Sequence, residues 1–302
     1  MKILLLGADG QVGWELQRAL APLGDVVGCR RDGIDGQAAD LDRPLALPAL
    51  LRHVRPQVVV NAAAYTAVDR AESESAQVRR INAESPAVLA AEARMLGALL
   101  VHYSTDYVFD GSGEAARDEI AATRPLNVYG ATKLEGEQAI QASGCRHLIL
   151  RTSWVYAARG GNFVRTMLRL AQERDVLKVI DDQIGAPTGA ELLADLTAHA
   201  VRAIGRDAAL CGLYHCTAGG ETSWHGYARF VIEQARAQGM PLRVPPEAVH
   251  PIATAAYPTP AQRPLNSRLD CDKLRQAFGL HLPPWQDGVV RILTEILNRP
   301  SS

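Results

Sequence analysis

The sequence begins MKILLLGADGQVGWELQRALAPLGDVVGCRR, residues 1–31, and this stretch decides the fold. The apolar run Lys2–Gly7 predicts a strand, Trp14–Leu23 a helix, and Asp25–Arg31 a second strand. A strand, a glycine turn, a helix and another strand within about thirty residues form a β-α-β unit. We therefore expect an α/β fold of the Rossmann type, a doubly wound parallel sheet with helices on both faces.

The alternation of strands and helices continues through the first half of the chain. Further strands are expected at Gln57–Asn61, Ala98–Ser104 and His147–Thr152, and helices at Leu45–Val54, Ala76–Met95 and Val128–Ala142. These strands are continuous apolar runs, as expected for strands covered on both faces. Pro86 is expected to start or kink a helix within the long helical stretch.

The pattern becomes less regular after Trp154. Helices are expected at Asn162–Arg174, Ala190–Ile204 and Trp285–Leu297, and strands around Val176–Ile180 and Leu213–Cys216. Seven prolines between Pro241 and Pro264 predict that this segment is extended loop. We expect a dinucleotide-binding domain at 1–155, interleaved with some later segments, and a smaller α/β substrate-binding domain at 156–302.

Composition excludes several classes of protein. The chain has 302 residues, is 47% hydrophobic and carries a formal charge of −1, which argues against disorder and against nucleic acid or membrane surface as partners. No apolar run approaches the roughly 18 residues of a membrane span, so we expect a soluble, cytoplasmic protein. Five scattered cysteines without a C-x-x-C pair indicate reduced core thiols.

The turn after the first predicted strand carries the spacing G-x-x-G-x-x-G, formed by Gly7, Gly10 and Gly13. At a strand-turn-helix junction, glycines let the backbone approach a pyrophosphate, and the helix N-terminus presents free N–H groups to it. We therefore expect Gly7, Gly10, Gln11, Val12 and Gly13 to bind a dinucleotide; the alternative is an ordinary structural turn. No G-x-x-x-x-G-K is present, which excludes a P-loop.

The end of the second predicted strand bears on the choice of cofactor. An NAD enzyme would carry an acidic residue there, but the sequence has Arg30 and Arg31. A guanidinium suits a 2′-phosphate, so we expect NADPH; in a chain with 28 Arg and 4 Lys, the alternative is a solvated strand end. Asp40 and Leu41 lie where the chain could meet the adenine, although Asp40 equally suits the start of a helix.

The pair Tyr129-x-x-x-Lys133 lies at the start of a predicted helix. Four-residue spacing places the phenol and the ammonium on one helix face, where the cation would lower the pKa of the phenol toward neutral pH. A hydroxyl at the end of the preceding strand would complete the set, and only one of Ser104 and Thr105 can point to the crevice by alternation. We choose Thr105 and expect the Ser104 hydroxyl to bond to backbone.

Taken together, these motifs resemble the extended short-chain dehydrogenase/reductase family, and within it the members that reduce the keto group of a nucleotide-linked 6-deoxy sugar. The resemblance extends nearly from end to end, through Gln11–Leu16, Val60–Asp69, Tyr103–Phe109, Pro125–Lys133, Leu150–Tyr156, Asp182–Thr188 and Arg263–Ser267. It implies reduction of the C4 ketone of dTDP-6-deoxy-L-lyxo-4-hexulose to dTDP-L-rhamnose, with NADPH or NADH as hydride source.

The resemblance also implies residue roles. Tyr129 would donate the proton, Lys133 would bind the nicotinamide ribose and tune the phenol, and Thr105 would hold the ketone oxygen. Cofactor contacts are implied for Ala62, Ala63 and Ala64, substrate contacts for Asp106 and Trp154, and a magnesium ion at a homodimer contact for Glu15, Glu191 and Glu295.

Two alternative functions share parts of this pattern. Sugar-nucleotide epimerases and dehydratases share the glycine turn and Tyr-x-x-x-Lys, but a dehydratase needs an Asp-Glu pair where this chain has Asp106 and Tyr107. A non-catalytic regulatory subunit of the same fold would keep the nucleotide pocket without turnover. The presence of Thr105, Tyr129 and Lys133 together argues against such a subunit.

Overall fold

The computed structural model describes residues 1–297 and contains a six-stranded parallel sheet. Its strands are β1 (Lys2–Leu6), β2 (Asp25–Cys29), β3 (Val58–Asn61), β4 (Leu99–Thr105), β5 (His147–Thr152) and β10 (Gly212–His215). The spatial order is β10-β5-β4-β3-β1-β2, so the strand order reverses between β1 and β3. This arrangement confirms the predicted doubly wound fold, in which ligands bind at the carboxyl ends of the strands beside such a reversal.

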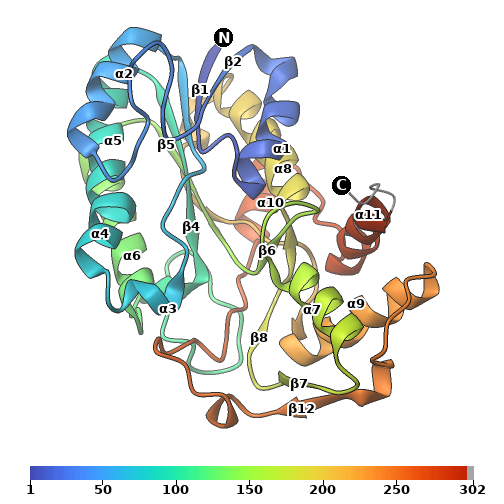
Figure 1. Cartoon of the computed structure of the whole chain (residues 1–302). Helices are drawn as coiled ribbons and strands as arrows, with labels where there is room; N and C mark the ends of the chain where they lie inside the picture. The colour runs from blue at the N-terminus through green and yellow to red at the C-terminus, as the bar shows by residue number, and fades with distance from the viewer. Residues whose placement is uncertain (298–302) are drawn as a thin grey trace.

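Helices cover both faces of the sheet (Figure 1). On one face lie α1 (Gln11–Leu20), α8 (Ala190–Ile204) and α10 (Asp272–Phe278), and on the other α2 (Leu47–Val54), α5 (Ser85–Leu96) and α6 (Val128–Ser143). Successive residues of β1 point to opposite faces, so Ile3 and Leu5 pack toward α1 and α8, whereas Leu4 and Leu6 pack toward α2 and α5. Because both faces of the central strands are buried, these strands are mostly apolar, and their polar residues gather toward the carboxyl ends of β3 and β4.

The long helical stretch predicted at Ala76–Met95 contains a wider turn. After the short α3 (Val68–Ala71), α4 (Ser75–Arg79) passes through a π-helical turn at Arg80–Glu84 into α5, whose first turn contains Pro86. Pro86 has no N–H to donate to the carbonyl of Asn82, which releases that carbonyl from the helix. Gly136 of α6 packs there; a Cβ on it would lie 2.3 Å from the Asn82 oxygen.

A second hydrophobic core lies beside the sheet, at the lower right of Figure 1. It is built by α7 (Phe163–Glu173), α9 (Trp224–Ala237) and α11 (Trp285–Leu297) with β7 (Leu177–Ile180) and β12 (Val249–Ile252). Two-residue strands join the two parts: β6 (Val155–Tyr156) pairs with β9 (Thr188–Gly189), and β8 (Ile184–Gly185) with β11 (Thr222–Ser223). Tyr227, fully buried on α9, packs among the aromatic rings of this core.

The second half confirms two expected strands and corrects one expectation. The strands predicted around Val176–Ile180 and Leu213–Cys216 are β7 and β10; β7 pairs in parallel with β12, and β10 joins the main sheet beside β5. The prediction that 241–264 is loop throughout was wrong, since β12 lies within it. Pro251 is tolerated in β12 because a two-stranded sheet leaves one side of each strand without a ladder partner.

The later part of the chain returns to the first. Helix α8 packs along α1, and β10 completes the sheet, although both follow residue 155. All five cysteines are free thiols, four of them buried. Within residues 1–297, no helix has the length and apolar character needed to cross a membrane.

Candidate active site

A cavity of 690 Å³ lies at the carboxyl ends of β1, β3, β4 and β5, beside the reversal of strand order. The main residues that line it are Gly7, Gly10, Gln11, Val12, Ala62, Ala63, Ala64, Ser104, Thr105, Asp106, Tyr129, Lys133, Thr152, Trp154, Arg159 and Trp224. Most predicted site residues therefore come together in one place, although they are far apart in the sequence.

The glycine turn forms one wall of this cavity. Gly7 has a φ of +78°, and a Cβ on it would lie 2.9 Å from the Cβ of Ala63, so only glycine fits between the ends of β1 and β3. Gly10 caps α1 without any side-chain hydrogen bond, which leaves the first N–H groups of the helix free for an anion. Gly13 does not line the cavity; a Cβ there would lie 1.9 Å from the Gly7 oxygen, so Gly13 lets α1 pack against the turn.

Besides Gly13, three residues predicted to contact the cofactor lie outside the cavity lining. Arg30 is exposed at the end of β2. Asp40 is half-buried and accepts a hydrogen bond from the Asp42 N–H at 3.0 Å, while Leu41 is buried in the core beside α2. The structure thus gives Asp40 and Leu41 local structural roles in addition to any role at a ligand.

On the opposite wall, Thr105 ends β4 and Tyr129 lies in the first turn of α6. Asn127 sets the start of that helix, because its Oδ1 accepts the Gly130 N–H at 2.8 Å and its Nδ2 donates to the Gln262 carbonyl at 2.8 Å. Thr105 donates to Asp106 Oδ1 at 3.0 Å and accepts from the Tyr107 N–H at 3.2 Å. The hydroxyl predicted at the strand end therefore lines the same cavity as the phenol.

The charge states of Tyr129 and Lys133 follow from burial. Burial raises the pKa of Tyr129 to about 12, and the hydrogen bond with Thr105 opposes this shift. Burial lowers the pKa of Lys133 to about 8, partly offset by the charge of Glu137. The Lys133 ammonium donates to the Tyr103 carbonyl at 2.6 Å. Within the protein alone, burial is the largest effect on the phenol and favours its protonated form. A lowering of this pKa by Lys133 together with an oxidised cofactor stays a prediction.

Unpaired polar atoms line the cavity beside Thr105. The Ser104 hydroxyl, the Thr152 hydroxyl and Asp106 Oδ2 are buried without a hydrogen-bond partner. The prediction that the Ser104 hydroxyl bonds to backbone was therefore wrong. Burial raises the pKa of Asp106 to about 6, against the hydrogen bonds from Ser267 and Thr105. Such atoms are suited to a ligand that carries hydroxyl groups.

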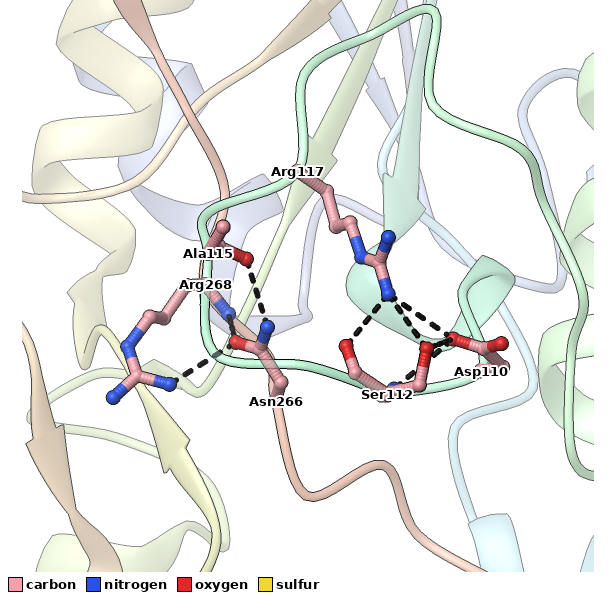
Figure 2. A network of polar contacts seen from close by, with 6 residues as sticks. All are labelled: Asp110, Ser112, Ala115, Arg117, Asn266 and Arg268. Carbon is pink, nitrogen blue, oxygen red and sulfur yellow. Dashed lines mark hydrogen bonds and ion pairs between the residues drawn. The ribbon is translucent and has the colours of Figure 1, made fainter.

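The segment that follows β4 is anchored to residues 266–269, because the Asn266 N–H donates to the Gly111 carbonyl and the Arg117 N–H donates to the Arg268 carbonyl. Figure 2 shows Arg117 donating to the Ser112 carbonyl at 2.6 Å and to Asp110 at 3.3 Å. It also shows Asn266 donating to the Ala115 carbonyl at 2.8 Å. The motif Arg263–Ser267 is therefore a structural support for the cavity.

An aromatic wall covers the side of the cavity toward the second core. Trp154 has a φ of +49° and stacks on Trp224 with ring centroids 3.6 Å apart and planes at 13°. Sequence reasoning found Trp154 but missed Trp224, which comes from α9 seventy positions later. It also missed Arg159, which lies over the Trp14 ring at 3.6 Å and has a buried Nη1 without a partner. Neither residue stands in a motif with a recognisable spacing.

The three glutamates predicted to hold magnesium lie away from the cavity lining. Glu191 of α8 is buried; burial raises its pKa to about 7, and the negative charges of Glu15 and Glu295 add to the shift. Glu15 lies 3.5 Å from Arg18, and Glu295 lies 3.7 Å from Arg291. The three carboxylates are thus close enough to interact, but residues 1–297 contain no cluster of three His, Cys, Asp or Glu side chains that could hold a metal ion.

Comparison with known proteins gives a consistent result. A family model described as the RmlD substrate binding domain matches residues 1–298. The dTDP-4-dehydrorhamnose reductase of Shigella flexneri is 53% identical over 296 residues, which cover 98% of each chain.

Solved structures agree with this sequence similarity. A dTDP-4-dehydrorhamnose reductase from Clostridium acetobutylicum superposes with a TM-score of 0.88 at 34% identity, covering 98% of this chain and 100% of that one. The dTDP-4-dehydrorhamnose reductase from Bacillus anthracis, solved in complex with NADP, superposes with a TM-score of 0.86 at 33% identity, covering 97% of this chain and 99% of that one.

Proposed function

The chain belongs to the dTDP-4-dehydrorhamnose reductase family of oxidoreductases, and from this premise we propose that it reduces the C4 ketone of dTDP-6-deoxy-L-lyxo-4-hexulose to dTDP-L-rhamnose with NADPH. The observation that carries the proposal is the shared cavity: the glycine turn forms one wall, and Thr105, Tyr129 and Lys133 form the other. Membership of an enzyme family sets aside the alternative of a non-catalytic regulatory subunit.

The glycine-turn wall fits a dinucleotide. The uncapped N–H groups of α1 and the unpaired Nη1 of Arg159 would both bond pyrophosphate oxygens. The small side chains of Ala62, Ala63 and Ala64 leave room for the dinucleotide along the same part of the cavity. The relative from Bacillus anthracis that was solved with NADP supports a nicotinamide cofactor. Preference for NADPH over NADH would come from Arg30, which is free at the end of β2 to meet a 2′-phosphate.

When bound, NADPH supplies the hydride that C4 of the sugar receives. Tyr129 then gives its proton to the C4 oxygen, which becomes the hydroxyl of the product. The raised pKa favours this direction, because the phenol holds its proton until a basic oxygen is formed beside it. Thr105, which lines the same cavity as the phenol, holds the ketone oxygen, and Lys133 binds the cofactor ribose with the ammonium that donates to the Tyr103 carbonyl.

The substrate side of the cavity fits a deoxysugar nucleotide. Asp106 Oδ2 and the hydroxyls of Ser104 and Thr152 would bond sugar hydroxyls, since they have no partner within the protein. Trp154, held flat against Trp224, would cover the sugar or the base.

Magnesium and a homodimer are further parts of the proposal. Glu15, Glu191 and Glu295 repel one another, so a shared cation would relieve an existing charge conflict. Because no metal-binding cluster is formed within residues 1–297, ligands from a second copy and from water would be required. The cytoplasm is the compartment we propose from the reduced thiols.

The direct test is to mix purified protein with NADPH and dTDP-6-deoxy-L-lyxo-4-hexulose and to follow the absorbance of the reduced nicotinamide. We expect absorbance to fall in proportion to dTDP-L-rhamnose formed. Oxidation of NADPH without the sugar, or no oxidation with it, would contradict the proposal. An epimerase would instead convert the sugar without net consumption of NADPH.

A further inference from the structure

His102 lies between Asn61 and Lys133 in a buried cluster of polar side chains, and the reaction proposed above gives His102 no role. It is on β4, in register with Asn61 of β3, and is 1% exposed. Its Nδ1 is 3.1 Å from Asn61 Nδ2, and its Nε2 is 3.2 Å from the Nζ of Lys133 on α6. Asn61 is also 1% exposed and Lys133 2%, so water does not satisfy these groups.

The bonding capacity of these groups allows two arrangements. His102 is neutral, because burial and the charge of Lys133 hold its pKa well below the ordinary value, so it has one N–H and one lone pair. A charged Lys133 can only donate, so His102 must accept with a lone pair on Nε2 and carry its hydrogen on Nδ1. The Asn61 side-chain oxygen must then face His102 to accept that hydrogen. A neutral Lys133 can accept from Nε2–H, and then the Asn61 NH₂ donates to Nδ1.

The second arrangement has a consequence at the cavity. With its NH₂ toward His102, Asn61 presents Oδ1 to the Ala63 N–H, from which it lies 3.3 Å. Ala63 lines the wall expected to contact the cofactor. The orientation of the Asn61 amide thus connects the lysine to the backbone of that wall.

We propose that His102 is a positioning residue for Lys133, and that Asn61, His102 and Lys133 form a hydrogen-bonded relay whose direction reverses with the charge of the lysine. This inference rests on the proposed function, because it assigns how the cofactor-binding lysine is held. In the charged state, the Tyr103 carbonyl and His102 Nε2 take two ammonium hydrogens and leave the third for a ligand in the cavity.

Other ionisable groups around Lys133 are accounted for. Glu137, one turn further along α6, raises the pKa of Lys133, but its carboxylate is held by Arg151 of β5 at 2.7 and 2.9 Å. Tyr129, one turn earlier on the same helix, is neutral. In the arrangement with a charged lysine, His102 is therefore the side chain whose lone pair faces the ammonium.

The test measures the pKa of Lys133 in the ligand-free protein by NMR, with carbon-13 at the lysine ε position. The chain has only four lysines, Lys2, Lys133, Lys178 and Lys273, so the spectrum is simple and the other three serve as internal references. A Lys133→Met variant assigns the resonance. Because neither NADPH nor sugar is present, the result is independent of whether the proposed reaction occurs.

Two variants of matched polarity separate the relay from a structural role. In His102→Asn the amide is too short to reach Lys133, so the pKa of the lysine is expected to fall by about one pH unit. In His102→Gln the longer amide reaches the position of Nε2, so the pKa of Lys133 is expected to recover most of the difference from the unmodified protein. His147→Gln, at a half-buried histidine of β5 that contacts the Cys145 carbonyl, is the control and should leave the pKa of Lys133 unchanged.

Asn61→Asp tests the relay in the opposite direction and does not depend on the folding of the His102 variants. A carboxylate only accepts, which fixes the hydrogen on His102 Nδ1 and the lone pair on Nε2, so the pKa of Lys133 is expected to rise. Combining Asn61→Asp with His102→Asn should abolish most of that rise. An unchanged Lys133 pKa in folded His102→Asn, or an equal rise in the double variant, would overturn the relay.

Discussion

Tyr129 is the residue whose removal tests the chemical step most directly. Tyr129→Phe deletes the proton donor but keeps the ring that packs edge-to-face on Tyr107 at 5.6 Å. We expect reduction of the sugar to fall by about 10²- to 10⁴-fold, the range of general acid catalysis, while NADPH still binds. Steady-state rates and cofactor fluorescence measure the two effects separately. A reduction rate equal to that of the unmodified protein would remove Tyr129 as the acid.

Arg30 tests the choice of cofactor. Its guanidinium is exposed at the end of β2 and is proposed to meet the 2′-phosphate that distinguishes NADPH from NADH. In Arg30→Ala the ratio of kcat/KM for NADPH to that for NADH is expected to fall about tenfold, because one charge-assisted hydrogen bond is lost. Arg55→Ala, at an exposed arginine after α2, is the matched control. A constant ratio in Arg30→Ala would assign Arg30 to the solvated surface.

Single residues also show what the sequence could and could not predict. Thr105, Tyr129 and Lys133 were found because their spacing and order carry chemical meaning. Trp224 and Arg159 were missed because they enter the cavity through packing of the second core and of Trp14. The pKa of Tyr129 was expected to be low from the nearby cation; within the protein alone, burial is the largest effect.

At the level of elements, the contact between α1 and the phosphate turn depends on Gly13. A Cβ at this position would lie 1.9 Å from the Gly7 oxygen, so Gly13→Ala must push α1 away from β1. We expect the free energy of unfolding to fall by about 3 kcal/mol, together with weaker NADPH binding. Gly161→Ala is the control, since a Cβ there meets nothing within 4 Å and the backbone is unstrained. Urea unfolding measures the stability of both variants. Equal free energies of unfolding for Gly13→Ala and Gly161→Ala would contradict the prediction.

The elements of the first half were predictable because each strand is a buried apolar run and each helix follows a turn. The second half was less so, for a physical reason. Strand partners there are set by long-range contacts: β7 pairs with β12, about seventy residues later, and β10 pairs with β5, about sixty residues earlier. Proline spacing suggested loop at 241–264, yet an edge strand tolerates a proline whose missing N–H faces no partner.

For the whole molecule, Glu191 makes stability depend on pH. Its pKa is raised to about 7 in the folded protein, so between its ordinary value and pH 7 the folded state binds a proton that the unfolded state has lost. The contribution of Glu191 to the free energy of unfolding is therefore fully present below its ordinary pKa and is lost as the pH rises to 7. Without added metal, Glu191→Gln should be more stable than the unmodified protein at pH 8, by about 2 kcal/mol, and no more stable at pH 4. Urea titrations at pH 8 and pH 4 measure the difference in stability between Glu191→Gln and the unmodified protein.

Magnesium addition at pH 8 tests the proposed homodimer contact. If Glu15, Glu191 and Glu295 share an ion with a second copy, Mg²⁺ should raise the melting temperature of the unmodified protein and shift its sedimentation to that of a dimer. Glu191→Gln should show neither effect. A melting temperature that is indifferent to Mg²⁺ would leave these acids as ordinary helix residues that repel one another.

The return of the chain to its first half also affects how it is made. The edge of β5 stays without its neighbour until β10 has been synthesised, some sixty residues later, and α1 lacks its partner α8 for about 170 residues. On the ribosome, the nascent nucleotide-binding half therefore waits with an open sheet edge and an uncovered apolar helix face. Chaperones that bind extended apolar segments would bind this chain during that interval, before β10 is added to the sheet.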